Sequence, residues 1–102
     1  MLYIVTLTYS RPKVEVDGHL DAHRSWLVEQ VRAGRVLAAG PIDTGLGGLI
    51  LAHAENRSTL DAALVADPFY VHGVADFHVQ PFSPALRANM FPAAWAVDAK
   101  AV

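Results

Sequence analysis

The order of apolar and polar positions predicts four strands in this chain. Residues 2–9 are rich in β-branched and aromatic side chains and contain no glycine, proline or charge, which is typical of a strand buried on at least one face. Further apolar runs predict strands at 36–39, 46–54 and 74–82. Gly47 and Gly48 indicate a bulge or a close backbone approach in the third strand. Turn-forming residues 40–45 join the second and third strands, so we expect these strands to pair antiparallel.

Two segments between these strands have the spacing of amphipathic helices. Asp17-Gly18 precedes the first helical pattern, whose core-facing side chains would be Val16, Leu20, His23, Leu27 and Val31. Its solvent face would carry Asp21, Arg24, Glu29 and Arg32. Gly34 is a typical C-terminal stop. Ser58 is the expected N-cap of the second helix, which ends at Asp67-Pro68 because the residue before a proline is disfavoured in the α region.

The resulting order, β-α-β-β-α-β over residues 1–82, is an α+β fold of the ferredoxin-like type. In this arrangement both helices cover one face of an antiparallel four-stranded sheet. The third strand is apolar on both faces, with Leu49 and Leu51 on one and Ile50 and Ala52 on the other. The helices cover a single face, and a large apolar patch is rarely left in water. We therefore expect a homodimer whose sheets pack face to face.

Residues 83–102 form a C-terminal tail outside this pattern. The tail carries Phe91 and Trp95 as apolar anchors, in a segment with no core of its own. We expect it to pack on its own domain, residues 1–82, or on the partner subunit.

Composition narrows the class of function. Hydrophobic residues make up 53% of the 102 residues, and 8 Lys and Arg balance 10 Asp and Glu to a net charge of −2. There is no basic stripe, so we expect no nucleic-acid partner. The absence of cysteine excludes disulfides, thiolate zinc sites and a cysteine nucleophile. No apolar run approaches the ~20 residues of a membrane span, and no signal-peptide pattern opens the chain, so we expect a cytoplasmic protein with no membrane partner.

His23 is the most informative candidate for chemistry, because it lies between Leu20 and Leu27 in the apolar stripe of the first helix. A buried imidazole without a partner costs about 1–3 kcal/mol, and histidine suits proton transfer near neutral pH. His23 is therefore either a core histidine bonded to a backbone carbonyl or a general base. Asp67 is either the N-cap of a turn that Pro68 begins or the carboxylate that orients His23, and both roles can hold at once.

The other histidines carry weaker signals. His19 and His23 are four residues apart, but the spacing lacks the glutamate of a metal-binding helix and a third ligand, so we expect no metal site. His53 and His78 lie on predicted strands and His72 lies in a turn, and the pattern leaves their roles open. The chain has no phosphate loop, no nucleophile elbow and no cofactor fingerprint. We therefore expect no cofactor.

A series of short motifs follows His23 in a characteristic order. They are Gly34 to Pro41, a glycine-rich strand, Asp67-Pro68-Phe69, Gly73-Val74 and Gln80-Pro81-Phe82. Together they resemble the YCII-related (YciI-like) family over residues 1–82. The resemblance implies a dimeric α+β barrel and a histidine–aspartate pair in a cleft, here His23 and Asp67. Members of this group include dehydrochlorinase-like and muconolactone-isomerase-like enzymes that act on small cyclic or aromatic compounds.

If His23 and Asp67 share a pocket, the feasible chemistry is proton transfer, with His23 as general base and Asp67 fixing its tautomer. We expect a cofactor-independent isomerase or lyase, including the dehydrohalogenase type, that acts on a small cyclic, lactone or aromatic compound. Trp26, Gly40 and Phe69 are the expected substrate contacts, the two aromatic rings by stacking on a flat molecule. The alternatives are a non-catalytic homodimer that binds a small ligand or serves as an accessory protein, and a purely structural His23.

Overall fold

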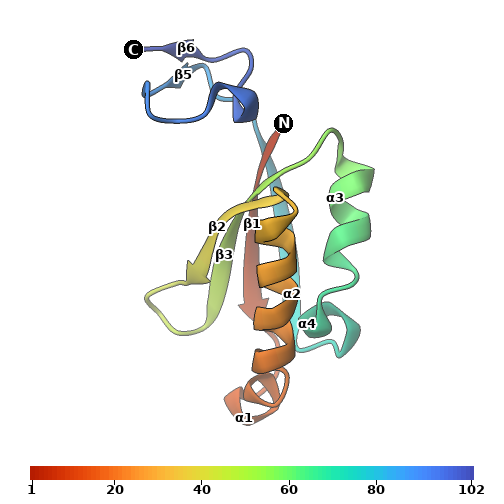
Figure 1. The fold of residues 1–102 in the computed structure, drawn as a ribbon. Helices are drawn as coiled ribbons and strands as arrows, with labels where there is room; N and C mark the ends of the chain where they lie inside the picture. The colour runs from red at the N-terminus through yellow and green to blue at the C-terminus, as the bar shows by residue number, and fades with distance from the viewer.

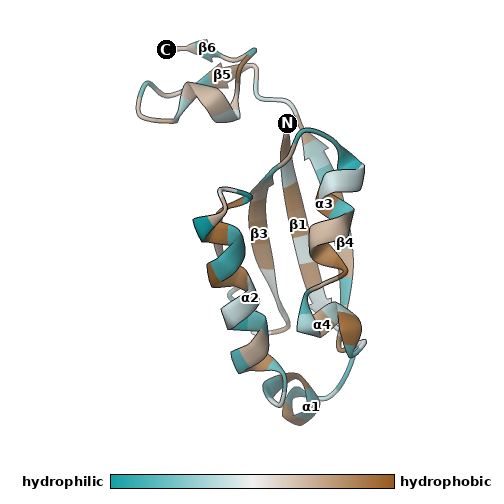
Figure 2. Ribbon diagram, turned by 45° about the vertical axis from the view of Figure 1, so that its right-hand side comes forward, coloured by the Kyte–Doolittle hydropathy of each residue, from teal (hydrophilic) through white to brown (hydrophobic).

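The computed structural model describes residues 1–102 and places a four-stranded antiparallel sheet under a layer of helices (Figures 1 and 2). The strands of the sheet are β1 (Leu2–Tyr9), β2 (Val36–Pro41), β3 (Gly47–His53) and β4 (Ala75–Phe82). The helices are α1 (Lys13–Asp17), α2 (Leu20–Arg32), α3 (Arg57–Leu64) and α4 (Pro68–Val71). The spatial order β2-β3-β1-β4 and the antiparallel register confirm the ferredoxin-like fold. No helix combines the length and the apolar content that a membrane crossing requires.

The hydrophobic core lies between the sheet and the helices. Side chains at alternate positions of β1 point toward the helices, and Tyr3, Val5 and Leu7 are buried there. Leu60 of α3 and Phe69 of α4 pack into the same cluster from the other layer. Since burying a large apolar side chain contributes about 1.5–3 kcal/mol, this cluster fixes how α2, α3 and α4 sit over the sheet.

The helix expected after Asp17-Gly18 is present as α2, but the apolar stripe predicted for it is wrong at both ends. Val16 is buried in the short helix α1, and a turn at Gly18 and His19 separates it from α2. The break changes the rotation of the second helix relative to the first, so the spacing from Val16 no longer defines a common face. The buried residues of α2 are His23, Trp26 and Gln30. Val31 is 49% exposed, while Leu20 and Leu27 are half-buried along the edge of the helix.

Two further boundaries differ from the predictions. The N-cap of α3 is Asn56, whose side-chain oxygen accepts the backbone N–H of Thr59 at 2.9 Å, and not Ser58, which lies inside the helix. Asparagine caps helices as well as serine does, so the better-placed oxygen decides the start. The strand β2 continues through Gly40 to Pro41, where a turn was expected. An edge strand accepts a proline at its end because no ladder hydrogen bond is lost there.

The second face of the sheet carries apolar side chains that no helix covers. Leu49 is 40% exposed, and Ile4 and Leu51 on the same face are half-buried. On the helix-facing side, by contrast, Ile50 and Ala52 are fully buried. The two faces of the sheet therefore differ in the single chain: helices bury one face, and apolar side chains are partly exposed on the other.

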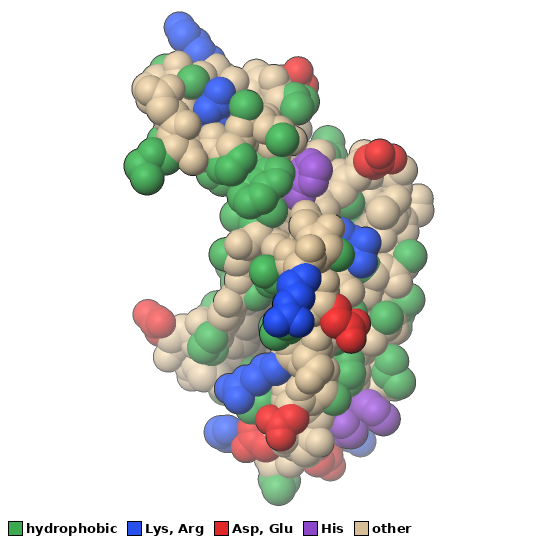
Figure 3. Space-filling view, in the orientation of Figure 1, with side chains coloured by type: hydrophobic (Ala, Val, Ile, Leu, Met, Phe, Trp, Pro, Cys, Tyr) green, Lys and Arg blue, Asp and Glu red, His purple; other side chains and the backbone are tan.

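The C-terminal tail forms a small unit of its own beyond the end of the sheet near the N-terminus (Figure 1). It contains the strands β5 (Leu86–Arg87) and β6 (Lys100–Ala101), which pair in parallel, and a 3₁₀ turn at Ala93–Trp95. Phe91 and Trp95 meet edge to face at a centroid distance of 5.9 Å. Figure 3 shows a hollow beside the tail, with apolar side chains on the part of the tail that borders it.

His53 gives the fold a predicted dependence on pH. Burial, and to a lesser extent the positive charge of the N-terminal ammonium group, lower the pKa of His53 below 6.5. The unfolded chain therefore binds this proton at higher pH than the folded chain does, so acidification favours unfolding. We expect the free energy of unfolding to fall as the pH drops below about 6.5, and His53→Gln to reduce that fall. Urea unfolding at about pH 7.5 and about pH 5 measures the free energy of unfolding of both proteins. An equal fall in the wild type and in His53→Gln would show that His53 does not cause the pH dependence.

Candidate active site

His23 and Asp67 meet in the interior although they are far apart in the sequence. His23 lies in the N-terminal half of α2, and Asp67 immediately precedes α4. Nδ1 of His23 is 2.8 Å from Oδ1 of Asp67, and the two residues are 8% and 0% exposed. The partner of His23 is thus a carboxylate and not a backbone carbonyl.

The local sequence explains why Asp67 lies at this point. Pro68 occupies the first turn of α4, where its fixed φ favours a helix start, and Asp67 is the N-cap. The Oδ1 atom of Asp67 accepts the backbone N–H of Phe69 at 3.0 Å. The same oxygen therefore caps α4 and contacts His23, so both roles considered for this aspartate are present. The other carboxylate oxygen, Oδ2, is buried without a hydrogen-bond partner.

The aromatic side chain of Phe69 holds the imidazole plane in place. The rings of His23 and Phe69 stack at a centroid distance of 3.9 Å with an interplanar angle of 5°. Trp26, one turn further along α2, lies 6.1 Å from the His23 ring. The imidazole is thus fixed by a hydrogen bond in its plane and by a ring on one face, which leaves little freedom to rotate.

The hydrogen bond to Asp67 determines which nitrogen of His23 is free. A carboxylate only accepts hydrogen bonds, so Nδ1 carries the proton in the neutral ring and donates it to Asp67. The second nitrogen, Nε2, makes no hydrogen bond within the chain and is not among the buried unpaired atoms. A neutral His23 therefore presents an available lone pair at Nε2, which is the arrangement a general base requires.

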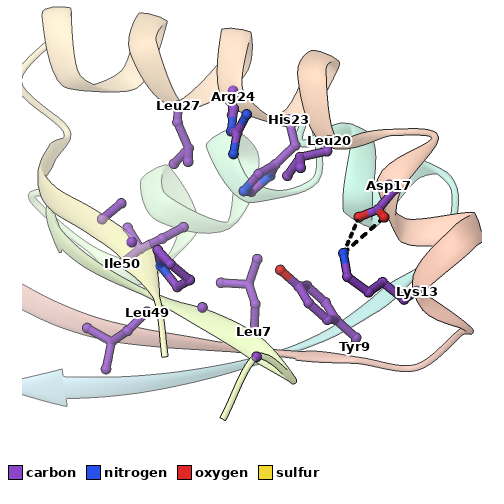
Figure 4. Close-up of a pocket in the computed structure, with 15 residues that line it drawn as sticks. Leu7, Tyr9, Lys13, Asp17, Leu20, His23, Arg24, Leu27, Leu49 and Ile50 are labelled. Carbon is purple, nitrogen blue, oxygen red and sulfur yellow. Dashed lines mark hydrogen bonds and ion pairs between the residues drawn. The ribbon is translucent and has the colours of Figure 1, made fainter. Parts of the chain in front are cut away.

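His23 lines a cleft of about 450 Å³ between α2 and the sheet (Figure 4). Leu7 and Tyr9 of β1 form the wall opposite α2, and the hairpin between β2 and β3 closes one side. Most of the interior surface is apolar, from Leu20, Leu27, Ile50 and neighbouring small residues of the hairpin. Lys13 and Asp17 lie at the α1 end, where the ammonium group contacts both carboxylate oxygens at 2.9 and 3.0 Å.

The three residues predicted to contact substrate lie in three different places in the structure. Gly40 lines the cleft together with His23. Phe69 does not line it, because its ring is 1% exposed and lies against the imidazole. Trp26 lines a different groove, between α2 and α3. The ring of Trp26 therefore packs in the helical layer, and Phe69 supports the imidazole from within the core.

Four polar residues of the cleft had no role predicted from the sequence. They are Tyr9, Lys13, Asp17 and Arg24. Arg24 was expected on the solvent face of the helix, and it is exposed, yet it also borders the cleft. The only sequence feature that could have pointed to Arg24 was its position next to His23. Consecutive residues of a helix point about 100° apart, so adjacency alone did not indicate a shared cleft.

Two other histidines, His19 and His72, lie outside the cleft and stack on each other at a ring-centroid distance of 4.0 Å.

The fold has a counterpart in a described family. The YCII-related domain matches residues 1–83, so the chain belongs to the YCII-related family. Among solved structures it is similar to the 5-chloro-2-hydroxyhydroquinone dehydrochlorinase of Burkholderia phenoliruptrix AC1100, in a complex with 2,5-dihydroxybenzoquinone. The identity is 23% and the TM-score 0.66, over 82% of this chain and 95% of that chain. No curated protein matches the chain significantly.

Proposed function

We propose that this protein is a small-molecule enzyme that transfers protons with a His23–Asp67 pair. The contact of 2.8 Å between Nδ1 of His23 and Oδ1 of Asp67 carries the proposal, because it leaves Nε2 without a partner on a side chain that lines a cleft. Asp67 is sealed behind the imidazole and reaches no ligand directly. Its part is to fix the tautomer and to stabilise the imidazolium that forms after proton transfer.

The reaction begins with removal of a proton from the substrate by Nε2 of His23. In a dehydrochlorination the electron pair left by the proton forms a new double bond while the carbon–chlorine bond breaks, and chloride leaves with the electron pair of that bond. The imidazolium then releases its proton to water. In an isomerisation the imidazolium returns the proton to a different atom of the same molecule. Positioned acid–base catalysis contributes about 10²–10⁴-fold, so the substrate must already be acidic, as enols, lactones and electron-poor rings are.

The shape and lining of the cleft support a small cyclic or aromatic substrate. A volume of about 450 Å³ lies within the range of small-molecule sites, and the walls are mainly apolar. The similar solved structure is a dehydrochlorinase whose complex contains a compound with one ring, 2,5-dihydroxybenzoquinone. We extend this substrate class to the present chain as part of the proposal.

The proposed functional unit is a homodimer. The sheet face that carries Leu49, Leu51 and Ile4 has no helix over it in the single chain, and Leu49 is 40% exposed, whereas the opposite face is buried by helices. A second copy of the same face would bury these side chains, as two packed sheets do. The cleft lies on the helix side of the sheet, so this pairing leaves it open to substrate.

Substitution of His23 by glutamine tests the proposed function. Purified protein is incubated with 5-chloro-2-hydroxyhydroquinone while chloride release is measured, and deuterium uptake from D₂O is followed for a set of lactones and enols. We expect His23→Gln to lower the rate by about 10²–10⁴-fold because no group remains at this position to accept the proton. The control is His72→Gln, an exposed histidine outside the cleft, whose rates should match those of the wild type. Unchanged rates in His23→Gln, or no turnover and no exchange by the wild type, would refute the proposal.

A further inference from the structure

The charges that line the cleft do not cancel completely. Lys13 is neutralised by Asp17, which contacts it through both carboxylate oxygens. Arg24 also lines the cleft, and it makes neither an ion pair nor a hydrogen bond within the chain. Asp67, the remaining carboxylate of the site, is fully buried behind His23. A ligand in the cleft therefore meets one unpaired cation and no unpaired carboxylate.

The positions of Arg24 and His23 give this cation a defined relation to the candidate base. The two residues are adjacent on α2, with His23 buried and Arg24 exposed (Figure 4). Both border the same space of about 450 Å³. A molecule that presents a proton to Nε2 of His23 thus has the guanidinium group beside it, at the more exposed part of the cleft.

We propose that Arg24 binds a negatively charged oxygen of the substrate and so selects anionic, planar ring compounds, namely carboxylates or phenolates. This inference rests on the proposed function and names its substrate class. A guanidinium group offers a planar set of donors that matches a carboxylate, and it stays charged at all relevant pH values. An anion held beside His23 also favours the imidazolium form electrostatically, which assists proton removal from the neighbouring part of the same molecule.

A matched pair of ligands and a matched pair of variants test the role of Arg24. Benzoate and benzamide are nearly equal in shape but differ in charge. Binding of each is measured by NMR titration of the wild-type protein, Arg24→Gln and the control Arg32→Gln. Arg32 is an exposed arginine in the last turn of the same helix that does not line the cleft. We expect Arg24→Gln to weaken benzoate binding by about tenfold, the lower end for a charge-assisted hydrogen bond in a partly exposed site.

The other measurements should show no such loss. Benzamide should bind the wild type more weakly than benzoate, with an affinity that neither variant alters, and Arg32→Gln should bind benzoate as the wild type does. The inference would be overturned by any of three results. These are equal losses of benzoate affinity in both variants, an unchanged benzoate affinity in Arg24→Gln, and no benzoate binding by the wild type.

The test of Arg24 and the test of the proposed function can fail independently of each other. If turnover depends on His23 while benzoate binding is independent of Arg24, the enzyme proposal stands and the choice of an anionic substrate is wrong. If benzoate binding depends on Arg24 while His23→Gln leaves all rates unchanged, the anion site stands and the role of His23 as base is wrong.

Discussion

Replacement of Asp67 by asparagine is expected to lower turnover by about 10²–10⁴-fold, the range that positioned acid–base catalysis contributes. The amide oxygen of asparagine can take the place of Oδ1 and accept the N–H groups of Phe69 and of Nδ1 of His23, so the cap of α4 and the tautomer should persist. The negative charge is lost, however, so the imidazolium that forms after proton transfer has no anionic partner.

Two measurements separate this electrostatic role from a changed tautomer and from a loss of stability. Nitrogen NMR of the neutral His23 ring should show the proton on Nδ1 in both the wild type and Asp67→Asn. Circular dichroism should show a folded variant. The control Asp61→Asn changes an aspartate of an exposed ion pair with Arg57 and should leave turnover unchanged. Wild-type turnover by a folded Asp67→Asn protein would show that the negative charge of Asp67 does not assist proton transfer.

Gly47→Ala is expected to have the largest effect on stability, because the backbone of β1 occupies the position of the new side chain. A Cβ at Gly47 would lie 1.8 Å from the carbonyl oxygen and 2.9 Å from the carbonyl carbon of Leu7. Both atoms belong to the central strand, so relief requires β1 and β3 to move apart. Overpacking of this kind costs about 1–3 kcal/mol and sometimes more, and we expect the upper part of this range or failure to fold.

Urea unfolding followed by circular dichroism measures this loss, with Gly40→Ala as the matched control. Gly40 lies in the neighbouring strand of the same hairpin, and a Cβ there meets no atom within 4 Å. Its replacement removes glycine freedom from the unfolded chain, so we expect a change of about 0.4–1 kcal/mol toward greater stability. Equal stabilities of the two variants would mean that β1 and β3 can separate at this point at little cost.

The sequence pattern predicted the strands of the sheet well, and it predicted the buried face of the first helix less well. The strand Leu2–Tyr9 matched its prediction, because an uninterrupted β-branched and aromatic run has one dominant local preference. The close backbone approach indicated by the glycine pair is confirmed at Gly47. Gly18, by contrast, ends α1 in an ordinary helical conformation, with φ −63° and ψ −21°, and the pattern did not predict the short helix before it. The buried face of α2 then followed from packing.

In the candidate site, too, features set by neighbouring residues could be predicted, and contacts between distant residues could not. The cap at Asp67 was readable from Asp67-Pro68, since both residues favour a helix start. Its contact with His23 spans 44 positions, and only the family resemblance pointed to it before the fold was known. No local pattern specifies which aromatic ring supports the imidazole and which lines the cleft. Arg24 was missed for a related reason, because helical spacing describes exposure and not the shape of the space beside the helix.

One oxygen of Asp67 serves both the start of α4 and the orientation of His23, and this sharing has an evolutionary consequence. Serine, threonine and asparagine begin helices nearly as well as aspartate, so the scaffold tolerates them at this position. None of them offers the imidazole a carboxylate. If the proposed function holds, a change of this one codon would leave a well-folded protein without the activity, and descendants with and without activity would differ there while sharing the same architecture.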